Sequence, residues 1–459
     1  PNSEFVGIDL SEVQIESGLK LIDSLSLTNI QLYSDDISKL NTRHYESRYK
    51  KFDYIILHGV FSWVPPELQK TILDVVQSLL NPNGLIYISY NTYPGWHAQM
   101  VLRDAMILHC DDNESPEQTI KKIPDALRYL KRFFKAADNE FTHYNTKRLN
   151  ALEQHSGSYL YHEFLETHNN PLYVSDFIRK ANNSGLQYLS DALLAFDNTL
   201  ILGSQRNTLL SKIDDRFKKL QYMDFMINQR FRRSLLCHNE QKIRNQFAPE
   251  HMVGLSYRGN LASKKPPRLD NETPCRFYQN LQQDKDTFIK LSHPVSKAAI
   301  QILADAYPSS IDYMDLLQQA CQRVADQGGL DFVKKIEPFY QEVYLLLISD
   351  WVSTDINSHT AINIDWNKPI TISALSWQYA KQVRFLPTFH QKAIDIDELG
   401  MQALELLSKG VLKQDLLVKI LKLNKDKHYF WKLNSNKKTE KQLILFLEIL
   451  QKNDLLEQK

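Results

Sequence analysis

The sequence predicts an α/β fold: an incomplete doubly wound, Rossmann-like sheet with a helical insertion, followed by a mostly α-helical C-terminal domain. Three observations predict it. Short apolar strands alternate with amphipathic helices over the first hundred residues, which indicates a parallel sheet with crossover helices. Residues 98–172 lose the strand pattern and have helical periodicity. From residue 286 onward, amphipathic helices dominate.

The strands and helices of the predicted sheet follow from apolar runs and their end signals. Phe5–Ile8 ends in Asp9, and Ser11 is placed as the N-cap of the next helix. Tyr54–Leu57 has no polar alternation, which is typical of a buried parallel strand. The remaining predicted elements are the strand Ile30–Tyr33, the helix Pro66–Leu80 ended by the breaker residues 81–84, the strand Leu85–Tyr90, the helix Val174–Ala181, and the strands Leu186–Leu189 and Phe231–Cys237.

A chain of 459 residues is expected to hold two or three domains. The predicted sheet domain combines residues 1–97 and 173–238. Residues 98–172 form the helical insertion, a candidate lid or dimerisation element. The polar stretch 239–285 is predicted to be a linker, and residues 286–459 a mostly helical regulatory or substrate-binding domain.

Composition excludes several classes of protein. The net charge of +1 argues against a dedicated nucleic-acid binder. No apolar run approaches the 18 or so residues of a membrane span. The four cysteines are far apart and form no CxxC pair, which favours free thiols and a cytoplasmic protein.

Acidic residues and a glycine follow successive predicted strands, at the sheet edge where such folds bind ligands. Asp9, with Leu10, is a candidate for the ribose hydroxyls of a nucleotide. Asp36 and Ile37 would bracket an adenine. His58-Gly59-Val60 places a glycine where backbone approaches a ligand closely. One acid at a strand end is more often a loop or helix cap, so the prediction rests on the ordered set.

Five segments carry a family resemblance, and two of them lie beyond any generic nucleotide-binding sheet. The chain resembles class I S-adenosylmethionine-dependent methyltransferases. It is most similar to the bacterial family with a methyltransferase regulatory domain, which includes the rickettsial protein lysine methyltransferases of outer membrane protein B. The resemblance covers about residues 1–350 and implies S-adenosyl-L-methionine as the methyl donor. The matching segments are FVGIDLS (Phe5–Ser11), HGVFSWVP (from His58), SYNTYPGWH (Ser89–His97), YLYHEFLETHNNPLY (Tyr159–Tyr173) and RFRRSLLCH (Arg230–His238).

One departure from the family pattern concerns the N-terminus. Family members have a first strand and a GxGxG-like loop before the FVGIDLS run. Here four residues precede Phe5, and none of the 14 glycines forms a GxG pair. We therefore expect a fragment or a split-gene product whose strands Phe5–Ile8 and Tyr54–Leu57 lack a shared neighbour. By itself it should bind the cofactor poorly.

Aromatic residues after the last strands suit the acceptor side of a methyl transfer. A lysine amine must lose its proton before it attacks, and an aromatic-lined channel would desolvate its ammonium group. Tyr93, Trp96 and His97 are the predicted catalytic residues, with His97 or His58 as proton acceptor. The alternatives are rings packed in the core and structural histidines. The predicted substrate-binding residues are Trp63, Tyr90, Asn91 and His162.

His162 begins an HExxE sequence within Tyr161–Glu166. This sequence lacks the second histidine of the HExxH zinc helix, so we expect no metal there and instead a lid over the substrate entrance.

The leading hypothesis is a methyltransferase acting on lysine side chains of an outer-membrane or surface protein, with a homodimer left open. The alternative is a non-catalytic or truncated subunit that needs a partner chain. A dehydrogenase predicts the same acidic strand ends but does not explain SYNTYPGWH. Small-molecule acceptors also stay open.

Overall fold

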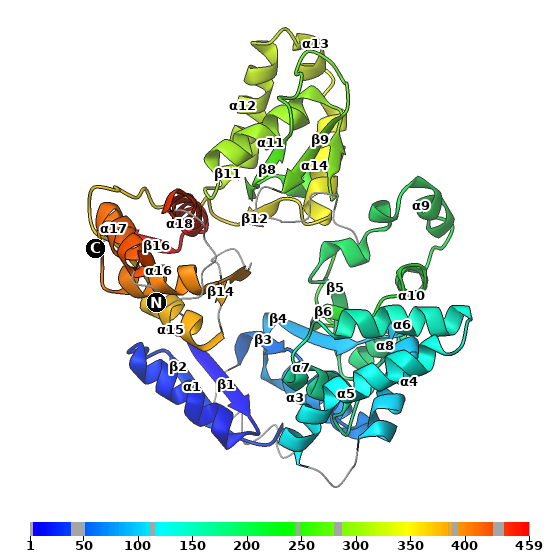
Figure 1. The fold of residues 1–459 in the computed structure, drawn as a ribbon. Helices are drawn as coiled ribbons and strands as arrows, with labels where there is room; N and C mark the ends of the chain where they lie inside the picture. The colour runs from blue at the N-terminus through cyan, green and yellow to red at the C-terminus, as the bar shows by residue number, and fades with distance from the viewer. Residues whose placement is uncertain are drawn as a thin grey trace. The chain divides into compact units, whose positions relative to one another are not determined.

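The computed structural model describes residues 3–37, 51–110, 115–244, 248–279, 287–383, 385–387, 393–425 and 436–458. The chain divides into two compact units: residues 1–34 together with 247–459, and residues 35–246. Figure 1 shows the elements of each. The first two strands, predicted as part of the sheet domain, group with the C-terminal residues.

A four-stranded sheet forms the centre of the unit 35–246. Its strand order is β3-β4-β6-β5. β3 and β4 are parallel, as predicted, whereas β6 runs antiparallel to both of its neighbours. The strands are β3 (Phe52–Leu57), β4 (Leu80–Asn91), β5 (Leu186–Asp191) and β6 (Phe231–His238).

The predicted breaker residues 81–84 follow a helix, but they lie inside a strand. Helix α3 (Pro66–Leu79) stops one residue before its predicted end, and β4 starts directly at Leu80. The register between β3 and β4 shifts between Phe52 and Tyr54. A Cβ on Gly84 would lie 3.0 Å from the Asp53 carbonyl oxygen, so glycine permits the close strand contact at this irregularity.

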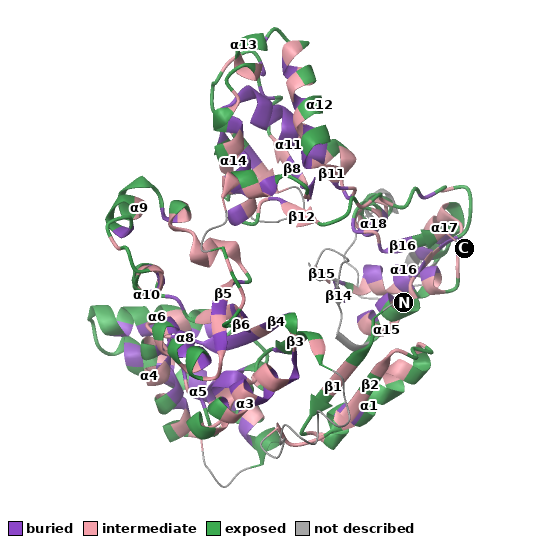
Figure 2. Cartoon of the chain, turned by 180° about the vertical axis from the view of Figure 1, so that it is seen from behind, coloured by how far each residue is buried: buried purple, intermediate pink, exposed green. Residues whose placement is uncertain are grey.

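Helices of this unit pack an apolar core against the sheet. The core joins α3 with β4, β5 and α8, and buried residues from it include Ile72, Ile86, Phe177 and Tyr188 (Figure 2). Burying side chains of this size stabilises the fold by about 1.5–3 kcal/mol each. The other helical elements of the unit outside the insertion are η2 (Phe61–Trp63), α8 (Val174–Asn183), η3 (Leu194–Asp197), η4 (Thr199–Leu202), α9 (Ser204–Leu210) and α10 (Arg216–Ile227).

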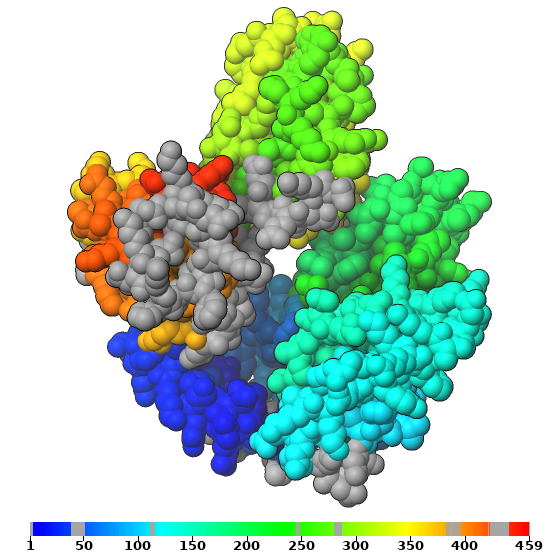
Figure 3. Space-filling model, in the orientation of Figure 1, coloured from blue at the N-terminus to red at the C-terminus, as the bar shows by residue number. Residues whose placement is uncertain are grey.

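The described part of residues 98–172 consists mainly of helices, as the sequence predicts. The helices are α4 (Gly95–His109), α5 (Pro116–Lys135), α6 (Glu140–Leu152) and α7 (Gly157–Phe164), drawn mainly in cyan in Figure 3. Ser115 and Asn139 begin α5 and α6 with reciprocal capping hydrogen bonds. Leu102, Leu127 and Phe164 belong to a separate apolar core that holds the four helices together.

The other unit begins with a parallel pair of strands, β1 (Phe5–Asp9) and β2 (Ile30–Ser34), joined by α1 (Glu12–Ser24). Ser11 accepts the Gln14 N–H as the predicted N-cap. Among the described strands, β1 pairs with β2 alone and β3 with β4 alone. That β1 and β3 lack a shared neighbour stays a prediction.

The polar stretch predicted as a linker contains three strands, which corrects that prediction. They are β7 (Ser256–Arg258), β8 (Leu261–Ser263) and β9 (Cys275–Gln279). Each buries one apolar side chain, Tyr257, Leu261 and Phe277. Strands this short leave the average composition polar, which is why the pattern missed them.

The described C-terminal residues combine short antiparallel sheets with helices, in the orders β10-β9-β8, β11-β7-β12, β13-β16 and β14-β15. Every helix in the described ranges is too short or too polar to cross a membrane. The remaining elements are η5 (Pro249–Met252), β10 (Ile289–Leu291), α11 (Pro294–Ala306), β11 (Ile311–Asp312), α12 (Tyr313–Ala325), α13 (Leu330–Val333), α14 (Glu337–Ile348), β12 (Ser353–Asp355), β13 (Ile370–Ile372), α15 (Ala374–Val383), β14 (Phe385–Pro387), β15 (Ala393–Asp395), α16 (Glu398–Ser408), α17 (Lys413–Lys425), α18 (Asn436–Gln451) and β16 (Leu456–Gln458).

Candidate functional site

Three of the sequence segments that were singled out meet at the carboxyl end of β4. The Ser62 hydroxyl, in η2, accepts the backbone N–H of Asn91 at 2.8 Å. The Asn91 side chain donates to the Asn169 amide oxygen at 3.1 Å. The backbone N–H of Asn170 donates to the Ser62 carbonyl at 2.8 Å. Asn91, predicted as substrate-binding, is buried in this network.

The segment after Asn91 is held from both sides by backbone hydrogen bonds. Thr92 donates to the Arg230 carbonyl at 2.9 Å, and Tyr93 donates to the Leu172 carbonyl at 3.1 Å. Gly95 donates to the Gln229 carbonyl at 2.9 Å, and a Cβ there would lie 2.5 Å from the same oxygen. The RFRRSLLCH segment therefore joins the cluster, and a side chain at position 95 would break it.

Two of the predicted catalytic residues, Tyr93 and His97, stack on each other. Their ring centroids are 4.1 Å apart with planes inclined by 16°. The Nε2 atom of His97 lies 2.9 Å from the hydroxyl of Tyr173, the last residue of the HNNPLY segment. Partial burial raises the pKa of the Tyr93 hydroxyl above its ordinary value. Sequence reasoning did not name Tyr173 as a site residue, although it ends a segment that carries the resemblance.

Two other predicted site residues lie in the protein interior. Trp96 is 1% exposed, and its ring lies 6.1 Å from that of Phe164. Tyr90 is also 1% exposed; it stacks on Phe177 at 4.1 Å and its hydroxyl is 3.1 Å from that of Ser234. Both rings thus pack in the interior of this structure, the alternative that the aromatic pattern left open.

His58, Gly59 and Val60 follow β3, as predicted. Gly59 has a φ of 70°, and a Cβ built on it would meet open space. Its N–H donates to the Ser89 hydroxyl at 2.9 Å. Nδ1 of the exposed His58 lies 3.0 Å from the Tyr87 hydroxyl. The backbone at Gly59 therefore adopts a conformation that favours glycine and leaves space beside it.

The acidic strand ends lie in different units. Asp9 is exposed, and its carboxylate accepts the Ser11 N–H at 2.8 Å; Leu10 is 72% exposed. In the other unit Asp36 is half-buried, and Ile37 packs on the apolar core.

Trp63 and His162, the remaining predicted substrate contacts, lie on η2 and α7. Trp63 is half-buried. His162 is exposed, with its Nδ1 atom 2.7 Å from a Glu166 carboxylate oxygen. The two ends of the HExxE sequence thus bond to each other.

Helix α7 is anchored by a residue that the sequence did not single out. The buried Arg103 of α4 donates to the carbonyls of Phe164 at 2.6 Å and Glu166 at 2.5 Å. A cation at a helix C-terminus is stabilising because the last carbonyls lack helical partners. On the same helix, burial raises the pKa of the Glu163 carboxyl, and the charge of Arg230 partly offsets this.

A buried ion-pair network in β5, β6 and α10 was also missed. Arg232 of RFRRSLLCH is fully buried and donates to both carboxylate oxygens of Asp224, at 2.7 and 3.0 Å. It also lies 3.4 Å from Asp191. Burial raises the pKa of Asp191 to about 6, against the opposing effect of Arg232. The network is structural, since its charges pair with one another.

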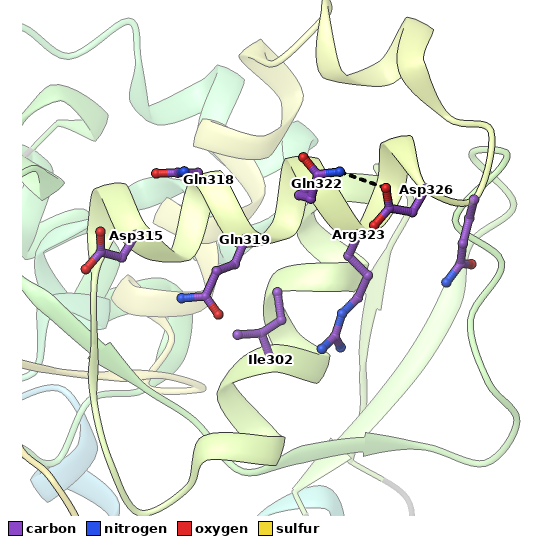
Figure 4. Close-up of a pocket in the computed structure, with 8 residues that line it drawn as sticks. Ile302, Asp315, Gln318, Gln319, Gln322, Arg323 and Asp326 are labelled. Carbon is purple, nitrogen blue, oxygen red and sulfur yellow. Dashed lines mark hydrogen bonds between the residues drawn. The ribbon is translucent and has the colours of Figure 1, made fainter.

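A surface pocket of about 680 Å³ lies on the C-terminal residues (Figure 4). It is lined mainly by polar residues of α12, and Gln322 donates to Asp326 at 2.7 Å. The pocket contains none of the predicted site residues. Its lining has amide and carboxylate groups but none of the aromatic rings that are expected for an acceptor channel.

Comparison with known families gives two matches along the first half of the chain. A "Methyltransferase domain" model matches residues 1–155. A "Predicted methyltransferase regulatory domain" model matches residues 156–238. The second match begins inside the helical insertion and ends with β6, so it includes Asn169, Asn170 and Leu172 of the hydrogen-bonded cluster, whereas Ser62 and Asn91 lie in the first match.

Two curated relatives are uncharacterized proteins of Rickettsia prowazekii. One is 31% identical over 70% of this chain and 57% of its own length, so the chain spans little more than half of that relative. The other is 34% identical over 41% of this chain and 74% of its own length.

Among solved structures, PKMT2 from Rickettsia typhi in complex with AdoHcy is 26% identical, with a TM-score of 0.84. The match covers 99% of this chain and 90% of that one. Together with the family models, these similarities account for the sheet, the helical insertion and the C-terminal residues. The chain belongs to the S-adenosylmethionine-dependent methyltransferases that carry a methyltransferase regulatory domain.

Proposed function

We propose that the complete protein transfers methyl groups from S-adenosylmethionine to lysine side chains of a protein, of the outer-membrane or surface type. The observation that carries this proposal is the similarity to PKMT2, which extends over 99% of the chain rather than over the sheet alone. The cysteines form no CxxC pair in the sequence, which agrees with the cytoplasmic location that we propose for it.

The donor side of the proposal uses the residues after the strands. Asp9 and Leu10 would contact the ribose, and Asp36 and Ile37 the adenine. Gly59 supports this role because it has no side chain and open space lies beside its backbone, between His58 and Val60. Bound S-adenosylmethionine would supply an electrophilic methyl group on its sulfonium.

The acceptor side of the proposal uses Tyr93 and His97. His97 would take a proton from the lysine ammonium group, and the ring of Tyr93 would hold the amine in line with the methyl carbon. The lysine nitrogen then forms a bond to that carbon as the carbon–sulfur bond breaks, and the positive charge passes from sulfur to nitrogen. We propose a packing role for Trp96 and Tyr90, because both are buried.

The test is transfer of labelled methyl from S-adenosylmethionine by the complete protein to an unfolded outer membrane protein B fragment. Amino-acid analysis of the product should recover the label in methylated lysine, and His97→Ala should slow transfer at least tenfold. Label in another residue type would overturn the lysine assignment. Cofactor binding without transfer to any acceptor would favour the alternative, a non-catalytic subunit.

A further inference from the structure

Five rings follow one another across residues 35–246, and we call this row the aromatic ladder. It consists of His97, Tyr93, Tyr173, Phe225 and Tyr222. Their successive centroid separations are 4.1, 5.3, 5.9 and 6.2 Å. The last two rings lie on α10, well beyond the residues that were predicted for the methyl acceptor.

The two ends of the ladder are exposed to solvent, and the two rings between them are half-buried. Tyr222 is 43% and Phe225 49% exposed, and the neighbouring Met226 is 38% exposed. Tyr93 and Tyr173 are half-buried, and His97 is exposed. Contiguous exposed apolar side chains mark interaction surfaces, whereas scattered ones do not.

Backbone hydrogen bonds and core packing hold the residues of the ladder in place. The backbone of Tyr93 is hydrogen-bonded to the carbonyl of Leu172, directly before Tyr173. On α10, Leu220 and Met223 are buried in the core and hold the helix that carries Phe225. Rings held in this way lose little conformational entropy on binding, so their contact area contributes to affinity.

We propose that the aromatic ladder binds an extended, lysine-bearing segment of the methyl-acceptor protein and leads it to Tyr93 and His97. This rests on the proposed function and deepens it. Ring faces attract cations, and the aliphatic part of a lysine side chain packs on apolar surface. The His97 and Tyr173 centroids are 6.0 Å apart, so Tyr93 lies beside the line that joins them. At roughly 3.3 Å per residue, the row accommodates at most about five residues of extended chain.

Continuity with the candidate site favours this occupant over a second copy of the chain. One end of the ladder is the Tyr93–His97 stack itself, so a bound segment places its lysine beside the residues proposed for transfer. The hydroxyls of Tyr173 and Tyr222 and the imidazole of His97 also give the row polar groups for a peptide backbone.

The test uses the complete protein and a fluorescent, unfolded outer membrane protein B fragment, with its dissociation constant measured by anisotropy. The double variant Tyr222→Ser, Phe225→Ser should weaken fragment binding about tenfold or more. S-adenosylmethionine affinity measured in parallel shows that the variant is folded. Phe133→Ser is the matched control, because Phe133 on α5 is 61% exposed and lies outside the ladder. It should bind the fragment as the wild type does.

Unchanged fragment affinity in the double variant would overturn the ladder assignment, whether or not methyl transfer occurs. A change in sedimentation from dimer to monomer without loss of fragment binding would overturn it too, because the row would then be an interface between copies. Fragment binding that depends on the ladder but is never followed by transfer would instead refute the proposed function and leave the ladder standing.

Discussion

The Ser62 hydroxyl accepts the backbone N–H of Asn91 at 2.8 Å, and both residues are buried. This one bond joins the HGVFSWVP and SYNTYPGWH segments, which are almost thirty residues apart. Through Asn170 the same serine also holds the HNNPLY segment. The candidate acceptor residues are therefore positioned by a polar network rather than by the sheet alone.

Replacing Ser62 by alanine should leave the Asn91 N–H buried without its acceptor. A lost partner of this kind costs about 1–3 kcal/mol. Hydrogen exchange should show faster exchange at Asn91 in Ser62→Ala, whereas Asn170 keeps its acceptor, the backbone carbonyl of residue 62. Ser78→Ala, which removes a hydroxyl bonded within α3, is the control and should leave both amides protected. Equal protection in the two variants would contradict the role of Ser62.

Replacing Arg232 by methionine should destabilise the unit 35–246 strongly. The change leaves Asp224 and Asp191 buried without their cation, and breaking a buried pair in this way costs about 3–5 kcal/mol. Urea unfolding followed by hydrogen exchange of β5 and β6 measures the loss. Arg233→Met, at a half-buried position, should cost far less. A similar loss in both variants would mean that the network contributes nothing specific.

Asp191 should make stability depend on pH in an unusual direction. Its folded-state pKa is raised to about 6, so the native state binds the proton more tightly than the unfolded chain. The free energy of stabilisation from Asp191 is greatest when the pH is below the pKa of this group in the unfolded chain, and it decreases as the pH rises through about 6. Relative to Asp191→Asn, the wild type should lose about 1–3 kcal/mol between pH 4 and pH 7. Parallel stability curves over that range would contradict the raised pKa.

The sequence predicts local structure well here because apolar periodicity acts over a few residues. The end of α3, the bounds of β1 and β6 and the helical insertion all follow from such patterns. The antiparallel position of β6 between β4 and β5 does not follow from such patterns, because strand pairing depends on contacts between residues far apart in the sequence. The hydrogen bonds that join Ser62, Asn91 and Asn169 likewise cannot be predicted from the spacing of residues. The aromatic pattern also could not separate the buried Trp96 from the half-buried Tyr93.

The exposed apolar side chains of β3 should promote self-association of this chain. Tyr54 and Ile56 are 73% and 72% exposed on a strand that ends the sheet. Open strands with apolar side chains pair readily with other chains. The double variant Tyr54→Thr, Ile56→Lys should show less self-association in sedimentation velocity. Leu108→Lys, at an exposed helical position, controls for added charge; an equal decrease there would remove β3 as the cause.

The central claim is that carboxylates after successive strands bind S-adenosylmethionine, and calorimetry on the complete protein tests it most directly. Asp9→Ala and Asp36→Ala should each weaken cofactor affinity about tenfold to a hundredfold, since a hydrogen bond to a charged group contributes about 1.5–3 kcal/mol. Asp23→Ala, an exposed acid on α1, should bind as the wild type does. Wild-type affinity in both the Asp9 and Asp36 variants would contradict the account.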